Sequence, residues 1–452
     1  MMGGRFLPTF LLAPLLAGCA TAEVEPVAHG VAVPDAWSSV APASAAPMRD
    51  WWAGFGNEEL TGLVAAARGQ GYDVEAAEAR VRQALASVRI AGAPLLPEID
   101  ASAGAERTGA FGDAGSSAYD AALTARYELD LWSRNRASRR AALAALDAAG
   151  HDREAVALVA ETETASAWLA TVAATERRSI ATLNLAAANQ VLALVESRYR
   201  AGTASPLELA QQRGLVAGLE QRLAVIEGDI AVDRAALAAL VGRPSPGFEV
   251  ATAKLSTLLV PAISADLPAT VLTRRPDIVA AERRLAAADA DVAAARAAML
   301  PQVTLSAGAG YESGRLSRLF DDPLYSLAAG LAAPIFAGDR LRGERDLAIA
   351  RREELLADYR QAIVTAFAEV DQALASIAAI EREQGAQAEA LRQAETAARL
   401  ANSRYRAGAE TLLTMLDAQR TLYAAQEDAL TLRQARLEAA VTLYRALGGS
   451  MP

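Results

Sequence analysis

The chain has 452 residues and a formal charge of −10, with acidic and basic side chains interspersed, which argues against a nucleic-acid-binding surface. Hydrophobic residues make up 52% of the chain but aromatic residues only 5%, because alanine supplies much of the apolar content. Alanine-rich chains with many Arg, Glu, Gln and Leu residues form long, closely packed helices. The composition therefore predicts a mainly helical protein.

The first 18 residues are predicted to be a lipoprotein signal peptide. Arg5 is their only charge, and the apolar run 6–16 is shorter than the roughly 20 residues needed to cross a bilayer. It leads through small residues to Cys19, the only cysteine in the chain. This segment resembles a bacterial lipobox, so we expect cleavage before Cys19, covalent lipid on its thiol and a lipidated tether over 19–56. An ordinary secretory signal with an incidental cysteine is the alternative.

A first repeat is expected over 57–242. Apolar residues recur at helical spacing at its start and stop at a pair of prolines. The period then changes to two over 98–131, with apolar residues on one face and charged residues on the other, which predicts a β-hairpin with strands of about ten residues. A proline-free helical stretch from 133 to 199 follows, which at 1.5 Å per residue would extend about 100 Å, before the chain turns back through 206–240.

A second repeat is expected over 267–448, with a helix, a β-hairpin over 302–336 and another long helical hairpin. A proline-containing connector over 243–266 separates the copies, and 449–452 form the C-terminal end. The sequence Arg-Tyr-Arg-Ala-Gly at 198–202 returns at 404–408, which is 206 positions later. The function must therefore be one that a duplicated unit performs.

The four predicted strands indicate a membrane barrel that several chains share. Strands of about ten residues match the span of a membrane barrel, and only a closed barrel or a helix can face lipid. Four strands cannot close a barrel, because the minimum is about eight. A soluble antiparallel sheet with one wet face is the alternative.

No catalytic or metal-binding constellation is visible in the sequence. The two histidines, His29 and His151, have no thiol or carboxylate at a spacing typical of a metal site. Neither a phosphate-binding glycine loop nor a nucleophile elbow is present. We therefore expect that the protein is not an enzyme, and that it binds no metal and no cofactor apart from the covalent lipid on Cys19.

The order of these elements resembles the TolC-like outer membrane efflux family, in particular its OprM-like and NodT-like lipoproteins, over nearly the whole chain. The most specific matches are Trp51-Trp52, Glu128-Leu129-Asp130-Leu131-Trp132, Arg274-Arg275-Pro276-Asp277-Ile278, Pro334-Ile335-Phe336 and Leu416-Asp417-Ala418-Gln419-Arg420. The resemblance implies a homotrimer in the outer membrane, with four strands per chain in a twelve-stranded barrel and long helices that form a periplasmic tunnel. It also implies a periplasmic adaptor and an inner-membrane transporter as partners.

The expected function is therefore the outer membrane channel and exit duct of a tripartite efflux system. The competing reading is a periplasmic helical scaffold or adaptor lipoprotein without a pore, which would share Cys19 and the long hairpins but would not need two strand pairs with a continuous apolar row. The sequence names neither the cargo nor the pump, and the residues alone do not give the number three.

The two turns between long helices are the candidate functional sites. By resemblance, six residues form the adaptor-contacting tips: Tyr199, Gly202, Ser205, Tyr405, Gly408 and Thr411. The alternative is that Ser205 and Thr411 only cap the returning helices and that the tyrosines only pack.

A periplasmic gate is expected just after the second turn. Leu413, Asp417 and Arg420 have spacings of four and three and so share one helix face, which by resemblance narrows the closed tunnel. The alternative is an exposed ion pair within one helix, worth a few tenths of a kcal/mol. Gln211 and Gly214 stand at the equivalent positions of the first copy, so an asymmetric gate is expected.

Overall fold

The computed structural model describes residues 30–38, 51–112, 115–251, 253–261 and 268–449. The predicted signal peptide, Cys19 and His29 lie outside these residues. The described chain divides into two compact units, and two of the four long helices contribute residues to both.

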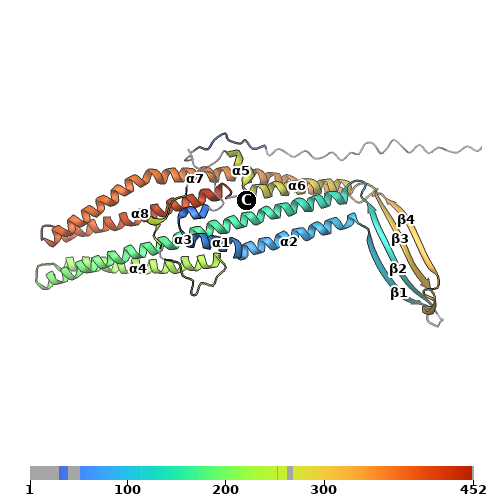
Figure 1. Cartoon of the computed structure of the whole chain (residues 1–452), viewed down its shortest axis with the longest axis horizontal. Coiled ribbons are helices and arrows are strands. Elements are labelled where there is room, and N and C mark those ends of the chain that lie inside the picture. Colours follow the sequence, from blue (N-terminus) through green and yellow to red (C-terminus); the bar gives the residue numbers. More distant parts are fainter. Residues whose placement is uncertain (1–29, 39–50, 113–114, 252, 262–267, 450–452) are drawn as a thin grey trace, which may run out of the picture. The chain divides into compact units, whose positions relative to one another are not determined.

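The first unit contains a four-stranded antiparallel sheet with the order β1-β2-β3-β4 (Figure 1). The strands are β1 (Glu98–Thr108), β2 (Ser116–Leu129), β3 (Gln302–Ser313) and β4 (Pro323–Ala332). The register sets Leu123 opposite Ala309 and Leu305 opposite Ala329, so the predicted apolar rows fall on one face of the sheet. Both edge strands are exposed along their whole length, which leaves unpaired backbone groups at the two edges.

The junction between β2 and the long helix that follows is fixed by side-chain hydrogen bonds. The Asp130 carboxylate accepts hydrogen bonds of 3.0 Å from the backbone N–H groups of Asn135 and Arg136. Burial opposes ionisation of this carboxyl, but these hydrogen bonds and the Arg136 guanidinium outweigh it and lower the pKa of Asp130. The Trp132 indole N–H donates to the Pro301 carbonyl at 2.6 Å, which joins the end of β2 to the start of β3. These contacts account for two residues of the Glu-Leu-Asp-Leu-Trp motif.

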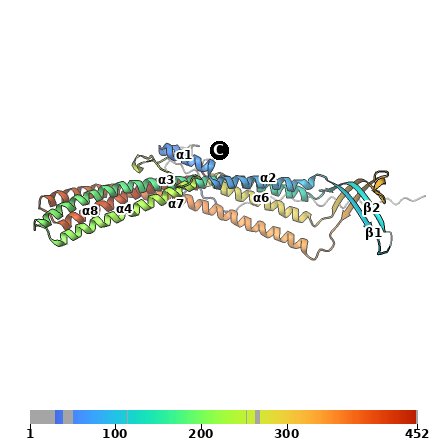
Figure 2. The same ribbon diagram turned by 90° about the horizontal axis from the view of Figure 1, so that it is seen from below.

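The four long helices repeat with one offset. They are α3 (Arg134–Arg200), α4 (Pro206–Leu240), α7 (Arg340–Arg406) and α8 (Leu412–Ala446). α3 and α7 both have 67 residues, and α4 and α8 both have 35. α7 begins 206 positions after α3, and α8 begins 206 positions after α4. The residue before α3 and the residue before α7 both have a left-handed backbone, with φ of 61° at Ser133 and 63° at Asp339. In both views the ends of the four helices lie side by side near the two turns (Figure 2).

Shorter helices complete the chain. They are α1 (Glu58–Gln70), α2 (Tyr72–Gly92), α5 (Pro268–Arg274) and α6 (Pro276–Ala297), with 3-10 turns at Trp51–Phe55, Ala93–Leu95, Leu255–Thr257 and Leu316–Arg318. In the first unit, α6 is tied to α7 by an ion pair between Asp289 and Arg352.

An aromatic cluster is one part of the core of the second unit. Trp51 stacks on Tyr444 with ring centroids 4.3 Å apart and meets Trp52 edge to face at 4.8 Å. The lipidated tether predicted over 19–56 includes Trp51–Phe55, and the structure places the three large aromatic rings of this segment in the core. Of the remaining tether, residues 30–38 are described, and Ser38 donates to the Asp371 carboxylate on α7 at 3.0 Å from its backbone N–H.

The Arg-Pro-Asp motif stabilises the same unit from the second repeat. Arg275 is 8% exposed and donates to Asp277, to Glu369 and to the Ala446 carbonyl at the end of α8. Burial opposes its positive charge, but the two carboxylates outweigh burial and raise the pKa of Arg275. The buried Arg275 of this motif therefore connects the start of α6 with the middle of α7 and the end of α8.

Candidate functional site

The first turn, between α3 and α4, has a glycine in a left-handed conformation and a complete cap. Gly202 has φ of 75°, which a residue with a side chain rarely adopts. The Ser205 hydroxyl accepts a hydrogen bond from the Glu208 backbone N–H at 3.2 Å, and the Glu208 carboxylate accepts one from the Ser205 N–H at 2.7 Å. This reciprocal pair fixes where α4 begins.

The second turn, between α7 and α8, repeats that geometry with a different cap. Gly408 also has φ of 75°, and the Thr411 hydroxyl accepts from the Thr414 N–H at 3.2 Å. Thr414 replaces the glutamate of the first turn, and Glu410 accepts from the Thr411 N–H at 3.2 Å instead. That hydrogen bond lowers the pKa of Glu410. Ser205 and Thr411 therefore both cap helices.

The two repeated tyrosines have different surroundings. Tyr405 is 2% exposed, whereas Tyr199 is 42% exposed. The Arg198 guanidinium lies over the Tyr405 ring, 4.7 Å from its centroid, and donates to the carbonyls of Tyr405 and Arg406 at 3.2 Å each. Tyr405 is thus buried within the single chain, and Arg198, which was not a candidate, lies over its ring. The contact of the Arg198 guanidinium with the Tyr405 ring and two carbonyls could not be predicted from the sequence, because the arginine and the tyrosine belong to different hairpins.

The three gate candidates lie on one exposed face of α8. Leu413 is 63% exposed, and Asp417 and Arg420 are exposed as well. The opposite face is buried through Leu412, Met415 and Leu416, each at most 2% exposed, in a cluster that also contains residues of α3, α4 and α7. Within the described part of the chain, neither Asp417 nor Arg420 has an ion-pair partner. The intrahelical pair that was the alternative to a gate is therefore not formed.

Leu207 is a further exposed apolar residue at the tip that sequence reasoning missed. It lies 206 positions before Leu413 and is 65% exposed, almost the same as its counterpart. The repeat offset alone would have found it. The charged positions are not duplicated, since Gln211 and Gly214 stand where the second copy has Asp417 and Arg420.

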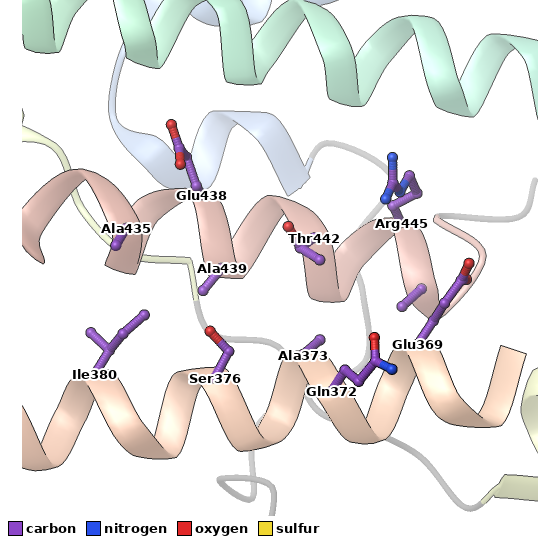
Figure 3. A pocket seen from close by; sticks show the side chains of 11 residues that line it. Glu369, Gln372, Ala373, Ser376, Ile380, Ala435, Glu438, Ala439, Thr442 and Arg445 are labelled. Carbon is purple, nitrogen blue, oxygen red and sulfur yellow. The ribbon is translucent and has the colours of Figure 1, made fainter. Parts of the chain in front are cut away.

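A cavity of about 350 Å³ lies between α7 and α8 (Figure 3). Small side chains, Ala373 and Ser376 of α7 and Ala439 of α8, face one another across it. Figure 3 shows Glu438 directed away from α7. Small side chains on both helices therefore leave this space open. Across the described residues, no three His, Cys, Asp or Glu side chains are grouped to hold a metal ion.

A duplicated pair of helical hairpins, a sheet with two open edges and an exposed apolar face together match a known family. A model of the outer membrane efflux protein family matches residues 63–243 and 267–449, one segment for each repeat. The chain belongs to the outer membrane efflux protein family.

Individual members of this family are similar over nearly their full length. The chain is 45% identical over 455 residues to the pyoverdine export outer membrane protein OpmQ of Pseudomonas aeruginosa, covering 98% of this chain and 96% of that one. It is 30% identical over 452 residues to the probable outer membrane lipoprotein SilC of Salmonella typhimurium, covering 96% of each. The open state of the MtrE outer membrane channel of Neisseria gonorrhoeae matches with a TM-score of 0.85 and 29% identity, over 93% of this chain and 96% of that one.

The chain is therefore an outer membrane efflux channel. Members of the family are trimeric channels of tripartite efflux systems, so the four strands of each chain supply a third of a twelve-stranded barrel and the long helices form a periplasmic tunnel. The open edges of β1 and β4 are paired in such a trimer. The family is one of transport channels rather than enzymes, and neither a soluble sheet nor a scaffold without a pore fits it.

Proposed function

We propose that this channel closes at its periplasmic tip through Leu413, Asp417 and Arg420, and opens when an adaptor engages the two turns. The observation that carries the proposal is the shared face of α8, on which an apolar side chain and two unpaired opposite charges are exposed within the first turns after the tip. In a trimer, three copies of this face surround one axis. The charges then find partners on neighbouring chains, and the leucines form an apolar ring.

Charge reversal tests the gate. Asp417→Arg and Arg420→Asp each place like charges together in the ring, so each should raise the open probability of single channels in planar bilayers. The double variant restores opposite charges and should close the channel again. Raising salt from 0.1 to 1 M shortens the Debye length from about 10 to about 3 Å, so it should partly open the wild type.

A matched control is available on α7. Glu389 and Arg392 form an exposed ion pair with the same spacing of three, within one helix. Arg392→Asp should leave the open probability unchanged. If the double reversal at 417 and 420 stays as open as the single variants, the two residues do not pair and the gate proposal fails.

The adaptor surface that we propose comprises the turns at Gly202 and Gly408 with the exposed caps Ser205 and Thr411. The tightly fixed backbone of both turns supports this, because a preorganised surface binds with a smaller loss of conformational entropy. Ala204→Arg and Ala409→Arg add bulk at the turns without removing a cap. Both should lower recovery of a periplasmic adaptor in pull-downs while trimer and conductance persist. Undiminished recovery would argue against this surface.

We propose a pyoverdine-like metabolite as cargo, supported by the 45% identity with OpmQ over almost the whole of both chains. The test is expression in a Pseudomonas aeruginosa strain that lacks OpmQ. Restored fluorescent pyoverdine in the medium supports the assignment. Conducting trimers without any restoration would reject this cargo and leave the channel function intact.

We propose finally that residues 1–18 are removed and that Cys19 carries the lipid. The lipobox-like sequence supports this, as does similarity to the probable lipoprotein SilC. Cys19→Ser behind a cleavable signal peptide should yield unlabelled protein that still conducts, because the barrel spans the membrane independently of an acyl chain. Complete failure to insert would instead make the anchor part of assembly.

A further inference from the structure

The residues that form the contact between the two hairpins of one chain recur in the opposite copies of the repeat, where they are exposed. Within the chain, Arg198 at the end of α3 covers the ring of Tyr405 at the end of α7 and donates to two carbonyls there. Leu194, one turn before Arg198, packs partly buried against the same cluster. The first hairpin thus offers an arginine and a leucine, and the second hairpin offers a buried tyrosine.

Both halves of this contact recur at the repeat offset of 206, and there both are exposed. Arg404 and Leu400 on α7 are the counterparts of Arg198 and Leu194, and their exposed fractions are 63% for the Arg404 side chain and 54% for Leu400. Tyr199 is the counterpart of Tyr405 and is 42% exposed, against 2% for Tyr405. Pro206 and Ala210 are exposed, whereas their counterparts Leu412 and Leu416 are buried.

We propose that Arg404 and Leu400 of one protomer pack on Tyr199 of the next protomer, in the way that Arg198 lies over Tyr405 and Leu194 packs against the cluster around it within the chain. A ring of three chains contains six hairpins in alternating order. If each hairpin contacts the next in the same way, first to second is the intrachain contact and second to first crosses the subunit boundary. The second copy of this chain is thus the occupant of both exposed faces, and Tyr199 belongs to the subunit interface rather than to the adaptor surface.

One departure from the repeat affects the strength of this contact. In the chain, Arg404 Nε lies 3.4 Å from Glu410, and its Nη2 donates to the Ala409 carbonyl at 3.3 Å. The equivalent of Glu410 in the first copy is Ala204, so Arg198 has no such competitor. An arginine has five N–H donors, so Arg404 keeps donors for the carbonyls of Tyr199 and Arg200 while it contacts Glu410.

Cross-linking of the purified trimer tests the contact. Cysteines at 199 and 404 treated with a short bismaleimide should give covalent dimers and trimers on denaturing gels. The matched control pair, cysteines at 198 and 405, should give only a compact monomer, because that contact lies within one chain. Each single-cysteine variant and the wild type, whose only cysteine is Cys19, set the background.

A second measurement avoids dependence on the cysteine variants. A photoreactive phenylalanine analogue at 199 retains an aromatic ring and should join to a peptide that contains Leu400 or Arg404 of a neighbouring chain, identified by mass spectrometry. The same probe at 405 should join within its own chain. If the control pair reacts but position 199 joins only to its own chain, to an adaptor in cells, or to nothing, the proposed contact is wrong.

Discussion

Replacing the gate leucine gives a prediction with a calculable size. Leu413 is 63% exposed in the single chain, and complete burial of a leucine contributes roughly 2 kcal/mol, so closure of the ring has about 1.3 kcal/mol left to gain per side chain. An alanine keeps about a third of that, and the loss is therefore about 1 kcal/mol per chain and about 3 kcal/mol per trimer. Since 1.4 kcal/mol is a factor of ten, Leu413→Ala should raise the open-to-closed ratio roughly a hundredfold.

Leu207 supplies the matched control for this prediction. It has the same residue type and almost the same exposure, 65%, but Gln211 and Gly214 stand at the positions equivalent to Asp417 and Arg420. Leu207→Ala should therefore change the open-to-closed ratio much less. Open probability in planar bilayers measures both, and the effect of Leu413→Ala should depend little on salt. If the channel of the Leu413→Ala variant stays closed, the apolar ring does not exist. Equal effects of both variants would refute the asymmetric gate.

Two further predictions concern stability. Asp130→Asn should destabilise the start of α3 by about 1 kcal/mol at neutral pH. Because the pKa of Asp130 is lowered in the folded chain, the wild type has this advantage above the unfolded pKa of about 3.9 and loses it as pH falls through the folded pKa. Melting curves of the two proteins should therefore converge in acid. A constant difference down to pH 2 would contradict this cause. Trp52→Phe should lower the melting temperature more than Trp51→Phe, because the Trp52 indole N–H donates to Glu161 at 3.4 Å while that of Trp51 is buried with no acceptor among the described residues; the reverse order would show that packing, and not hydrogen bonding, distinguishes the two rings.

Much of the fold follows from patterns that depend on short stretches of sequence. The change from helical spacing to alternation marks where β1 and β3 begin, and the register confirms that the apolar rows share one face. The exact repeat of the tip sequence foreshadows the equal lengths of α3 and α7. Because such periodicities are set by neighbouring residues, they can be read without knowledge of the rest of the chain.

Contacts between distant segments were not predictable in the same way. Trp51–Phe55 lie in the core because Tyr444, almost 400 positions later, offers a ring to stack on. Likewise, Tyr199 and Tyr405 have the same neighbours in sequence, yet only Tyr405 is buried. The buried cluster includes Tyr405, Leu412 and Leu416 of the second copy but not their counterparts in the first copy. Duplicated sequence predicts duplicated local structure but leaves open which copy is covered.

Native mass spectrometry of the full chain in mild detergent tests the central claim, that the channel is a barrel shared between chains. The sheet has only four strands and two open edges, and unpaired backbone groups are costly in hydrocarbon, so a single chain is unsuited to span the membrane. We expect a trimer as the membrane-inserted species, and we expect conductance to be lost when the trimer is dissociated. A stable, inserted and conducting monomer would contradict it.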